Sequence, residues 1–94
     1  MILSCRDKRT RDFVAGKVVK AFSGIARAAQ LKIDRMHAAV SLQDLAVLPG
    51  NRFETLKGER KGQYSIRIND QWRICFEWQA GAKGPANVEI VDYH

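Results

Sequence analysis

Several residue types are scarce in this 94-residue chain, and each scarcity argues against a class of protein. There are only two cysteines, Cys5 and Cys75, and two histidines, and their positions match neither a disulfide framework nor the spacing of a metal site. No apolar run approaches the roughly 20 residues that span a membrane. We therefore expect reduced thiols, no metal, no cofactor and no membrane partner.

Targeting and nucleotide-binding signals are also missing. Charge begins at Arg6, too early for the apolar core of a signal peptide, so we expect a cytoplasmic protein. The seven glycines form no P-loop, dinucleotide fingerprint or nucleophile elbow. A hydrophobic content of 46% with 28% charged residues is ordinary for a globular protein. We expect one domain over residues 1–94.

Acidic residues are fewer than basic ones, 10 against 16, which gives a net charge of +6. On a chain of this size such an excess predicts an anionic partner. Nucleic acid, a lipid surface and an acidic protein all satisfy that condition. The position of the positive charges in the fold decides among them.

The N-terminal half reads as one strand followed by helices. Residues 1–5 fit a short strand, and residues 6–22 a short helix with a loop. Residues 23–40 form the clearest helix, with Ser23 as its N-cap and Lys32 off its apolar face. The residues of that apolar face are Ile25, Ala29, Ile33, Met36 and Val40.

The C-terminal half reads as strands. A short helix begins after Ser41, with Asp44 as a capping-box partner, and ends at Pro49. The segments with strand character are residues 52–58, 62–68, 72–78 and 87–94. This order predicts an α+β domain with two or three N-terminal helices on one face of an antiparallel β-sheet.

The apolar pattern also predicts the register of the second and third of these strands. A three-residue loop over 69–71 pairs Ile66 with Ile74 and directs both apolar sets to one core. Arg67 then lies opposite Arg73, on the face away from the helices. At about 6 Å the repulsion is roughly 1–3 kcal/mol in a surface-like dielectric, so an anion between the two guanidinium groups is expected.

Two kinds of anion can relieve that repulsion. Glu77 and Glu89 are the candidate internal partners, and a phosphate is the candidate ligand, because the planar fork of arginine suits it. If Leu56 packs inward, Lys57 points to the same face. We assign further contacts with an RNA backbone to Arg52, Arg60, Lys61 and Arg67.

Metal-free RNA cleavage fits these residues best. The 2′-hydroxyl of RNA is itself the nucleophile, so the protein must supply a base, an acid and positive charge for the phosphorane. Arg73, Arg67 and Lys57 are the candidate cations. His94 is a candidate for proton transfer, because an unperturbed histidine titrates near the working pH. Tyr93 is the candidate to stack on a base or to hold the phosphate.

The stretch "GNRFETLKGERKGQYSIRINDQWRICFEW", followed by "VEIVDYH", resembles the HigB-type toxins of the RelE/ParE superfamily. The resemblance is specific over the C-terminal half. It implies a compact RelE-like fold and active residues at the matching positions Lys57, Arg73, Asp92, Tyr93 and His94. Some family members carry a histidine where this chain has Glu54, and strand parity predicts that Glu54 faces inward with Leu56.

The resemblance also implies an activity and partners. Such toxins cut mRNA in the ribosomal A site without metal and are neutralised by a helix-turn-helix, HigA-like antitoxin encoded in the adjacent gene. The toxin–antitoxin complex binds its own operator DNA. Two other functions remain open at this point: a ParE-like toxin that binds a protein such as DNA gyrase without cleaving anything, and a non-catalytic RNA- or DNA-binding module.

Overall fold

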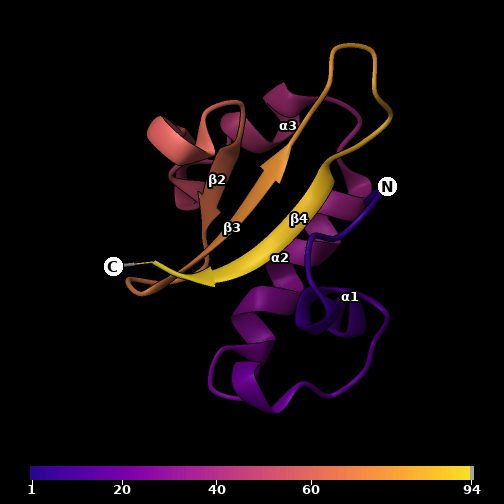
Figure 1. Ribbon diagram of the computed structural model, residues 1–94, viewed down its shortest axis with the longest axis vertical. Helices are drawn as coiled ribbons and strands as arrows, with labels where there is room; N and C mark the ends of the chain where they lie inside the picture. The colour runs from indigo at the N-terminus through magenta and orange to yellow at the C-terminus, as the bar shows by residue number, and fades with distance from the viewer. Residues whose placement is uncertain (94) are drawn as a thin grey trace.

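The computed structural model describes residues 1–93. It contains one β-sheet of four strands. The strands are β1 (Glu54–Thr55), β2 (Tyr64–Arg67), β3 (Trp72–Glu77) and β4 (Ala86–Asp92). Each pairs antiparallel with the next along the chain, in the order β1-β2-β3-β4 (Figure 1). His94 lies outside the described residues.

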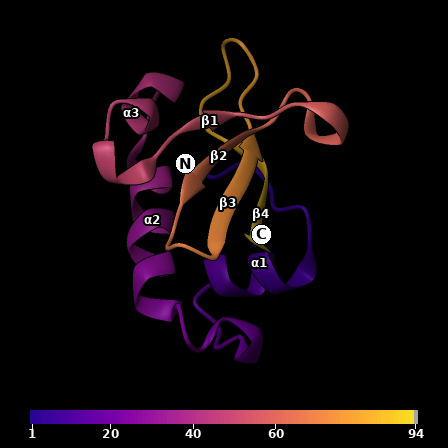
Figure 2. The ribbon, with the colours of Figure 1, turned by 90° about the vertical axis from the view of Figure 1, so that its left-hand side faces the viewer.

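Three helices precede the sheet: α1 (Lys8–Val14), α2 (Ala26–Ala38) and α3 (Leu42–Ala46). Figure 2 shows α2 and α3 on one side of the strands, which leaves the other side of the sheet open. Over residues 1–93, no helix is long and apolar enough to cross a membrane. The predicted α+β fold, with helices on one face of an antiparallel sheet, is confirmed.

The hydrophobic core lies between the helices and the covered face of the sheet. Burial of these side chains is the main stabilising term, at roughly 25 cal/mol per Å² of apolar surface. The largest fully buried members are Phe22, Phe76, Ile33, Met36, Leu45, Ile66, Ile74 and Ile90.

The predicted register between β2 and β3 is confirmed. Ile66 pairs with Ile74 and Arg67 with Arg73. In the connecting turn, the Asn69 side-chain oxygen accepts hydrogen bonds from the backbone N–H groups of residues 71 and 72, both at 2.8 Å. These bonds hold the hairpin at the loop length that the apolar pattern requires.

Two predictions about the main helix are wrong. Ser23 is not its N-cap, because Phe22 is buried by a 3₁₀ turn and α2 begins only at Ala26. Val40 is exposed, because the helix ends at Ala38 and the next residue is extended. Lys32, which was predicted off the apolar face, lies outside the hydrophobic core cluster but is nevertheless buried, because polar groups of a neighbouring turn bind its ammonium group.

The predicted first strand is also wrong in extent. Within residues 1–5 only Cys5 forms a β-bridge, parallel to Val88. The Leu3 N–H donates to the carbonyl of Pro85 at 2.8 Å, but Pro85 has no N–H to return. Asn87 then bends β4 with a φ of 51°. The segment therefore runs along the edge of β4 without extending the sheet.

One polar cluster attaches the turn Pro49–Asn51 to the helices. The Lys32 ammonium donates to the Asn51 side-chain oxygen at 2.7 Å, and the Asn51 amide donates to the Leu45 carbonyl at 3.0 Å. Burial lowers the pKa of the Lys32 ammonium. Because Asn51 is fully buried, it fixes the start of the segment that leads into β1.

Asn51→Ala should lower the free energy of unfolding by about 2–3 kcal/mol, because it removes one partner each from a buried ammonium and a carbonyl. Gln30→Ala is the matched control: its amide bonds Asp34 on the exposed surface, and its loss should change stability by less than about 0.5 kcal/mol. Urea denaturation followed by circular dichroism measures both. Equal losses in the two variants would contradict this role of Asn51.

Candidate functional site

Arg73 is largely buried on the open face of the sheet, and its charge is held there by hydrogen bonds. Nε donates to the Ser65 hydroxyl at 2.8 Å. Nη2 donates to the carbonyl of Arg52 at 2.6 Å and, more weakly, to that of Ser65 at 3.4 Å. Neutral oxygens therefore fix the guanidinium plane, while its positive charge remains available to an anion.

Arg52 presents that carbonyl because of an unusual backbone conformation. It follows the 3₁₀ turn Pro49–Asn51 and is left-handed, with φ 43° and ψ 55°. A non-glycine residue reaches this region at a cost of about 1–2 kcal/mol. The buried Asn51 side chain holds the preceding turn in place, which maintains the conformation.

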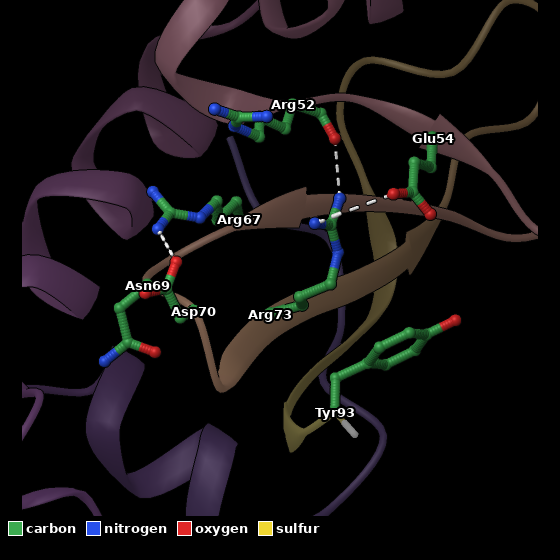
Figure 3. A pocket seen from close by; sticks show the side chains of 7 residues that line it. All are labelled: Arg52, Glu54, Arg67, Asn69, Asp70, Arg73 and Tyr93. Atoms are coloured by element: carbon green, nitrogen blue, oxygen red, sulfur yellow. Dashed lines mark hydrogen bonds and ion pairs between the residues drawn. The ribbon is translucent and has the colours of Figure 1, made fainter.

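A pocket of about 320 Å³ opens beside the Arg73 guanidinium (Figure 3). Its walls come from the segment before β2, from the β2–β3 hairpin and from the residue after β4. The lining residues are Arg52, Glu54, Arg67, Asn69, Asp70, Arg73 and Tyr93. Three guanidinium groups face two carboxylates and a phenol ring there, a composition that suits an anionic ligand.

The repulsion predicted between the paired arginines is relieved by two carboxylates of the pocket. Arg67 forms an ion pair with Asp70 in the hairpin turn. Nη1 of Arg73 lies 3.8 Å from a carboxylate oxygen of Glu54. The two guanidinium groups therefore point to different partners, as Figure 3 shows.

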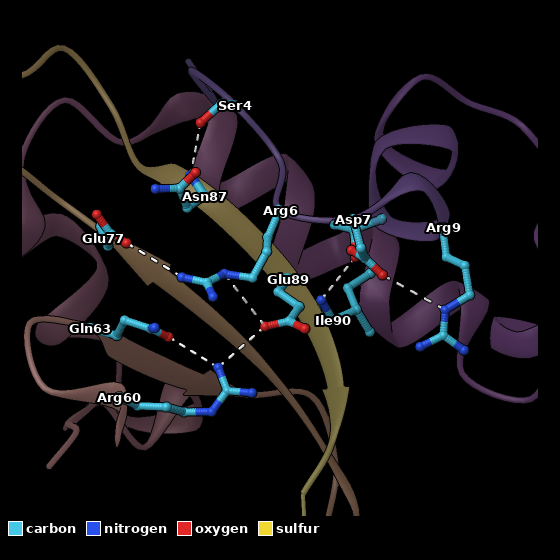
Figure 4. Close-up of polar contacts among 11 residues, drawn as sticks. Ser4, Arg6, Asp7, Arg9, Arg60, Gln63, Glu77, Asn87, Glu89 and Ile90 are labelled. Carbon is cyan, nitrogen blue, oxygen red and sulfur yellow. Dashed lines mark hydrogen bonds and ion pairs between the residues drawn. The ribbon is translucent and has the colours of Figure 1, made fainter. Parts of the chain in front are cut away.

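The internal partners predicted for this pair, Glu77 and Glu89, lie elsewhere on the open face. Arg6 approaches both, at 3.6 and 3.9 Å, and Arg60 bonds Glu89 at 3.2 Å and Gln63 at 3.1 Å (Figure 4). This prediction is wrong because the N-terminal segment, which carries Arg6, runs beside β4. The ion pairs of Arg6 and Arg60 with Glu77 and Glu89 largely neutralise that half of the face.

The prediction of which side of the sheet Glu54 faces was also wrong. Glu54 pairs with Ser65 in the ladder and so lies on the Arg73 face. Leu56 shares its parity and is buried, but outside the core cluster, whereas Phe53 packs against that cluster. Glu54 is therefore a wall of the pocket. Lys57 is exposed beyond the end of β1 and is not among the lining residues.

At the C-terminal end, two of the predicted residues are described, and of these Tyr93 lines the pocket. The Arg73 guanidinium carbon lies 6.0 Å from the centre of the Tyr93 ring, which is a cation–π distance. Asp92 is exposed and accepts a hydrogen bond from the Gln71 amide at 3.0 Å, outside the pocket lining. The predicted role of His94 falls on a residue that is not described.

The other predicted RNA contacts divide in the same way. Arg52 and Arg67 line the pocket, whereas Arg60 belongs to the ion pairs of the other half and Lys61 is exposed in the loop.

Residues 1–93 contain no cluster of three or more histidine, cysteine or acidic side chains that could hold a metal ion. Burial raises the pKa of the Cys75 thiol, which disfavours the nucleophilic thiolate.

Sequence comparison relates the chain to a toxin family. The family model described as the RelE-like toxin of type II toxin–antitoxin system HigB matches residues 5–94. The chain is also 46% identical, over 59 residues, to Toxin HigB-1 of Vibrio cholerae serotype O1. That alignment covers 63% of this chain and 62% of the relative, so the chain spans less than two thirds of the relative's length.

Comparison of folds agrees with the sequence match. A solved structure, the YoeB/ParE toxin from Agrobacterium tumefaciens, superimposes with a TM-score of 0.56. The superposition covers 99% of this chain and 97% of that toxin. At 15% identity, this similarity concerns the fold alone.

Ser65→Ala should weaken the binding of inorganic phosphate by about threefold to tenfold, because Nε of Arg73 loses the acceptor that orients the guanidinium group. Ser4→Ala is the matched control: its hydroxyl accepts from the Asn87 N–H far from the pocket, and its loss should leave phosphate binding unchanged. Amide chemical shifts of Arg73 and Tyr93 in a phosphate titration report the affinity. Unchanged affinity in Ser65→Ala would refute this anchoring role.

Proposed function

The chain belongs to the HigB family of RelE-like toxins of type II toxin–antitoxin systems, and we propose that it is an endoribonuclease that cleaves mRNA on the ribosome and so arrests translation. The observation that carries this proposal is the Arg73 guanidinium, fixed by neutral oxygens at the wall of a solvent-open pocket. Such a group stabilises negative charge as it develops on a phosphate.

The reaction proceeds through the RNA's own nucleophile. The 2′-oxygen forms a bond to the adjacent phosphorus, and the bond from phosphorus to the 5′-oxygen breaks, which leaves a cyclic phosphate and a 5′-hydroxyl. A base removes the proton of the 2′-hydroxyl, and an acid protonates the departing 5′-oxygen. No metal or cofactor is required by this scheme.

Individual roles follow from position in the pocket and from the family resemblance. Arg73 neutralises the phosphorane, and the half-exposed ring of Tyr93 stacks on a base beside it. Lys57, Asp92 and His94 are assigned to proton transfer and substrate contact on the resemblance.

RNA contacts outside the catalytic set are assigned to the remaining cations. Arg52 and Arg67 lie beside the pocket and contact the flanking phosphates. Arg60 and Lys61 extend the contact along the neighbouring loop, where Arg60 exchanges its bond to Glu89 for one to RNA. The affinity of such contacts falls as salt rises.

A type II toxin has an antitoxin partner. For this chain we propose a HigA-like antitoxin with a helix-turn-helix, encoded in the adjacent gene, and a complex that binds operator DNA. Ribosome and mRNA are the targets, and the cytoplasm is the compartment in which they meet. The net charge of +6 favours an acidic partner surface.

A second candidate function is that of a ParE-like toxin that binds a protein target such as DNA gyrase and cleaves nothing. The ion-paired half of the open face favours it, because alternating charges of Arg6, Glu77, Glu89 and Arg60 resemble the polar rim of a protein interface. Cleavage assays separate the two functions.

Arg73→Ala should reduce mRNA cleavage at least about 100-fold, because it removes the fixed charge at the phosphate. Arg6→Ala is the control, since it removes the same charge from the other half of the face and should retain activity within about threefold. Primer extension on mRNA in a reconstituted translation system measures cleavage, and circular dichroism verifies folding. A folded, fully active Arg73→Ala protein would overturn the nuclease proposal, and intact mRNA with altered DNA supercoiling would favour the second function.

Tyr93→Ala should lower cleavage by about 10- to 100-fold, the range expected when one base loses its stacking partner. Tyr93→Phe keeps the ring and should retain most of the activity. The same primer-extension assay compares both variants with the parent. A loss in Tyr93→Phe as large as in Tyr93→Ala would assign the role to the hydroxyl group instead of to stacking.

A further inference from the structure

A carboxylate of the chain itself lies in the pocket against the key guanidinium. The Glu54 Oε1 atom is 3.8 Å from Arg73 Nη1, and Figure 3 shows the two side chains extending toward each other across the pocket. Glu54 is half-exposed, with 54% of its side chain accessible, whereas only 11% of the Arg73 side chain is accessible. The carboxylate is therefore the solvent-exposed member of the pair, and the guanidinium group is the buried one.

The hydrogen bonds of Arg73 leave one nitrogen for a ligand. Nε and Nη2 are bonded to Ser65 and to the Arg52 carbonyl. Within residues 1–93, Nη1 has no hydrogen-bond acceptor, and Glu54 is its ion-pair partner. A phosphate that binds Arg73 therefore meets the Nη1 atom, and that is where Glu54 lies.

A carboxylate and a phosphate cannot share this position. Both are anions, and at contact distance they repel each other. The separation of 3.8 Å exceeds hydrogen-bond length, so the pair is held by charge alone and can be displaced. The pairing of Glu54 with Ser65 in the β-ladder keeps the carboxylate within reach of Arg73 even when its side chain rotates away.

We propose that Glu54 is an internal competitor for the anion site, which lowers the affinity of the pocket for a nucleic-acid phosphate until the substrate displaces it. This inference rests on the proposed function, since the displacing anion is the RNA backbone. Its consequence is selectivity: isolated phosphates and dilute RNA bind weakly, and a strand presented at high local concentration binds well. Asp70 does not share this role, because its partner is Arg67.

The test compares Glu54→Gln with Asp70→Asn, two substitutions that remove one negative charge from the same pocket. The probe is a short, fluorescent single-stranded DNA, which has no 2′-hydroxyl and cannot be cleaved. Anisotropy titrations at fixed ionic strength should show that Glu54→Gln binds about fivefold more tightly than the parent, and Asp70→Asn at most about twofold. Combined with Arg73→Ala, the gain from Glu54→Gln should disappear.

Several outcomes decide the matter. Equal tightening in both variants would show a simple effect of net charge and overturn the proposal. Unchanged or weaker binding by both Glu54→Gln and Glu54→Ala, with parental melting temperatures, would also overturn it, since Glu54 would then support Arg73. Cleavage of translated mRNA by the parent is measured separately: its absence refutes the proposed function, while tighter DNA binding by Glu54→Gln still supports the competitor.

Discussion

The pocket depends on how a largely buried arginine is oriented by oxygens that carry no charge. The hydroxyl of Ser65 and the carbonyl of Arg52 fix Nε and Nη2 of Arg73, and neither neutralises it. The β2–β3 register places Ser65 beside Arg73, and the turn held by Asn51 places the carbonyl. Packing, hairpin chemistry and a strained residue thus converge on the orientation of one side chain.

The parts of this arrangement that follow from local rules could be predicted. Alternation of apolar residues along β2 and β3 allows only one loop length, and this places Arg67 opposite Arg73 on the open face. The same parity points to Ser65, two residues from Arg67, as a residue of that face, although the prediction omitted it. The antiparallel sheet and the helices on one face follow equally from periodicity.

What could not be predicted depends on contacts between distant segments. Leu56 appeared to be a core residue, yet β1 is only two residues long and its facing is set by pairing with β2. This error placed Glu54 inside and directed Lys57 to the face of Arg67 and Arg73. Similarly, nothing local indicates that Arg6 reaches Glu77 across the edge of the sheet, because that contact depends on the path of the N-terminal segment.

Arg52 contributes to the pocket in two ways, through its backbone and through its side chain. Its backbone oxygen supports Arg73, whereas its own side chain forms part of the pocket wall. Asparagine and glycine adopt left-handed backbone readily, whereas β-branched residues and proline do not. A substitution at position 52 by a residue that tolerates this backbone therefore changes the pocket wall while the carbonyl that supports Arg73 stays in place.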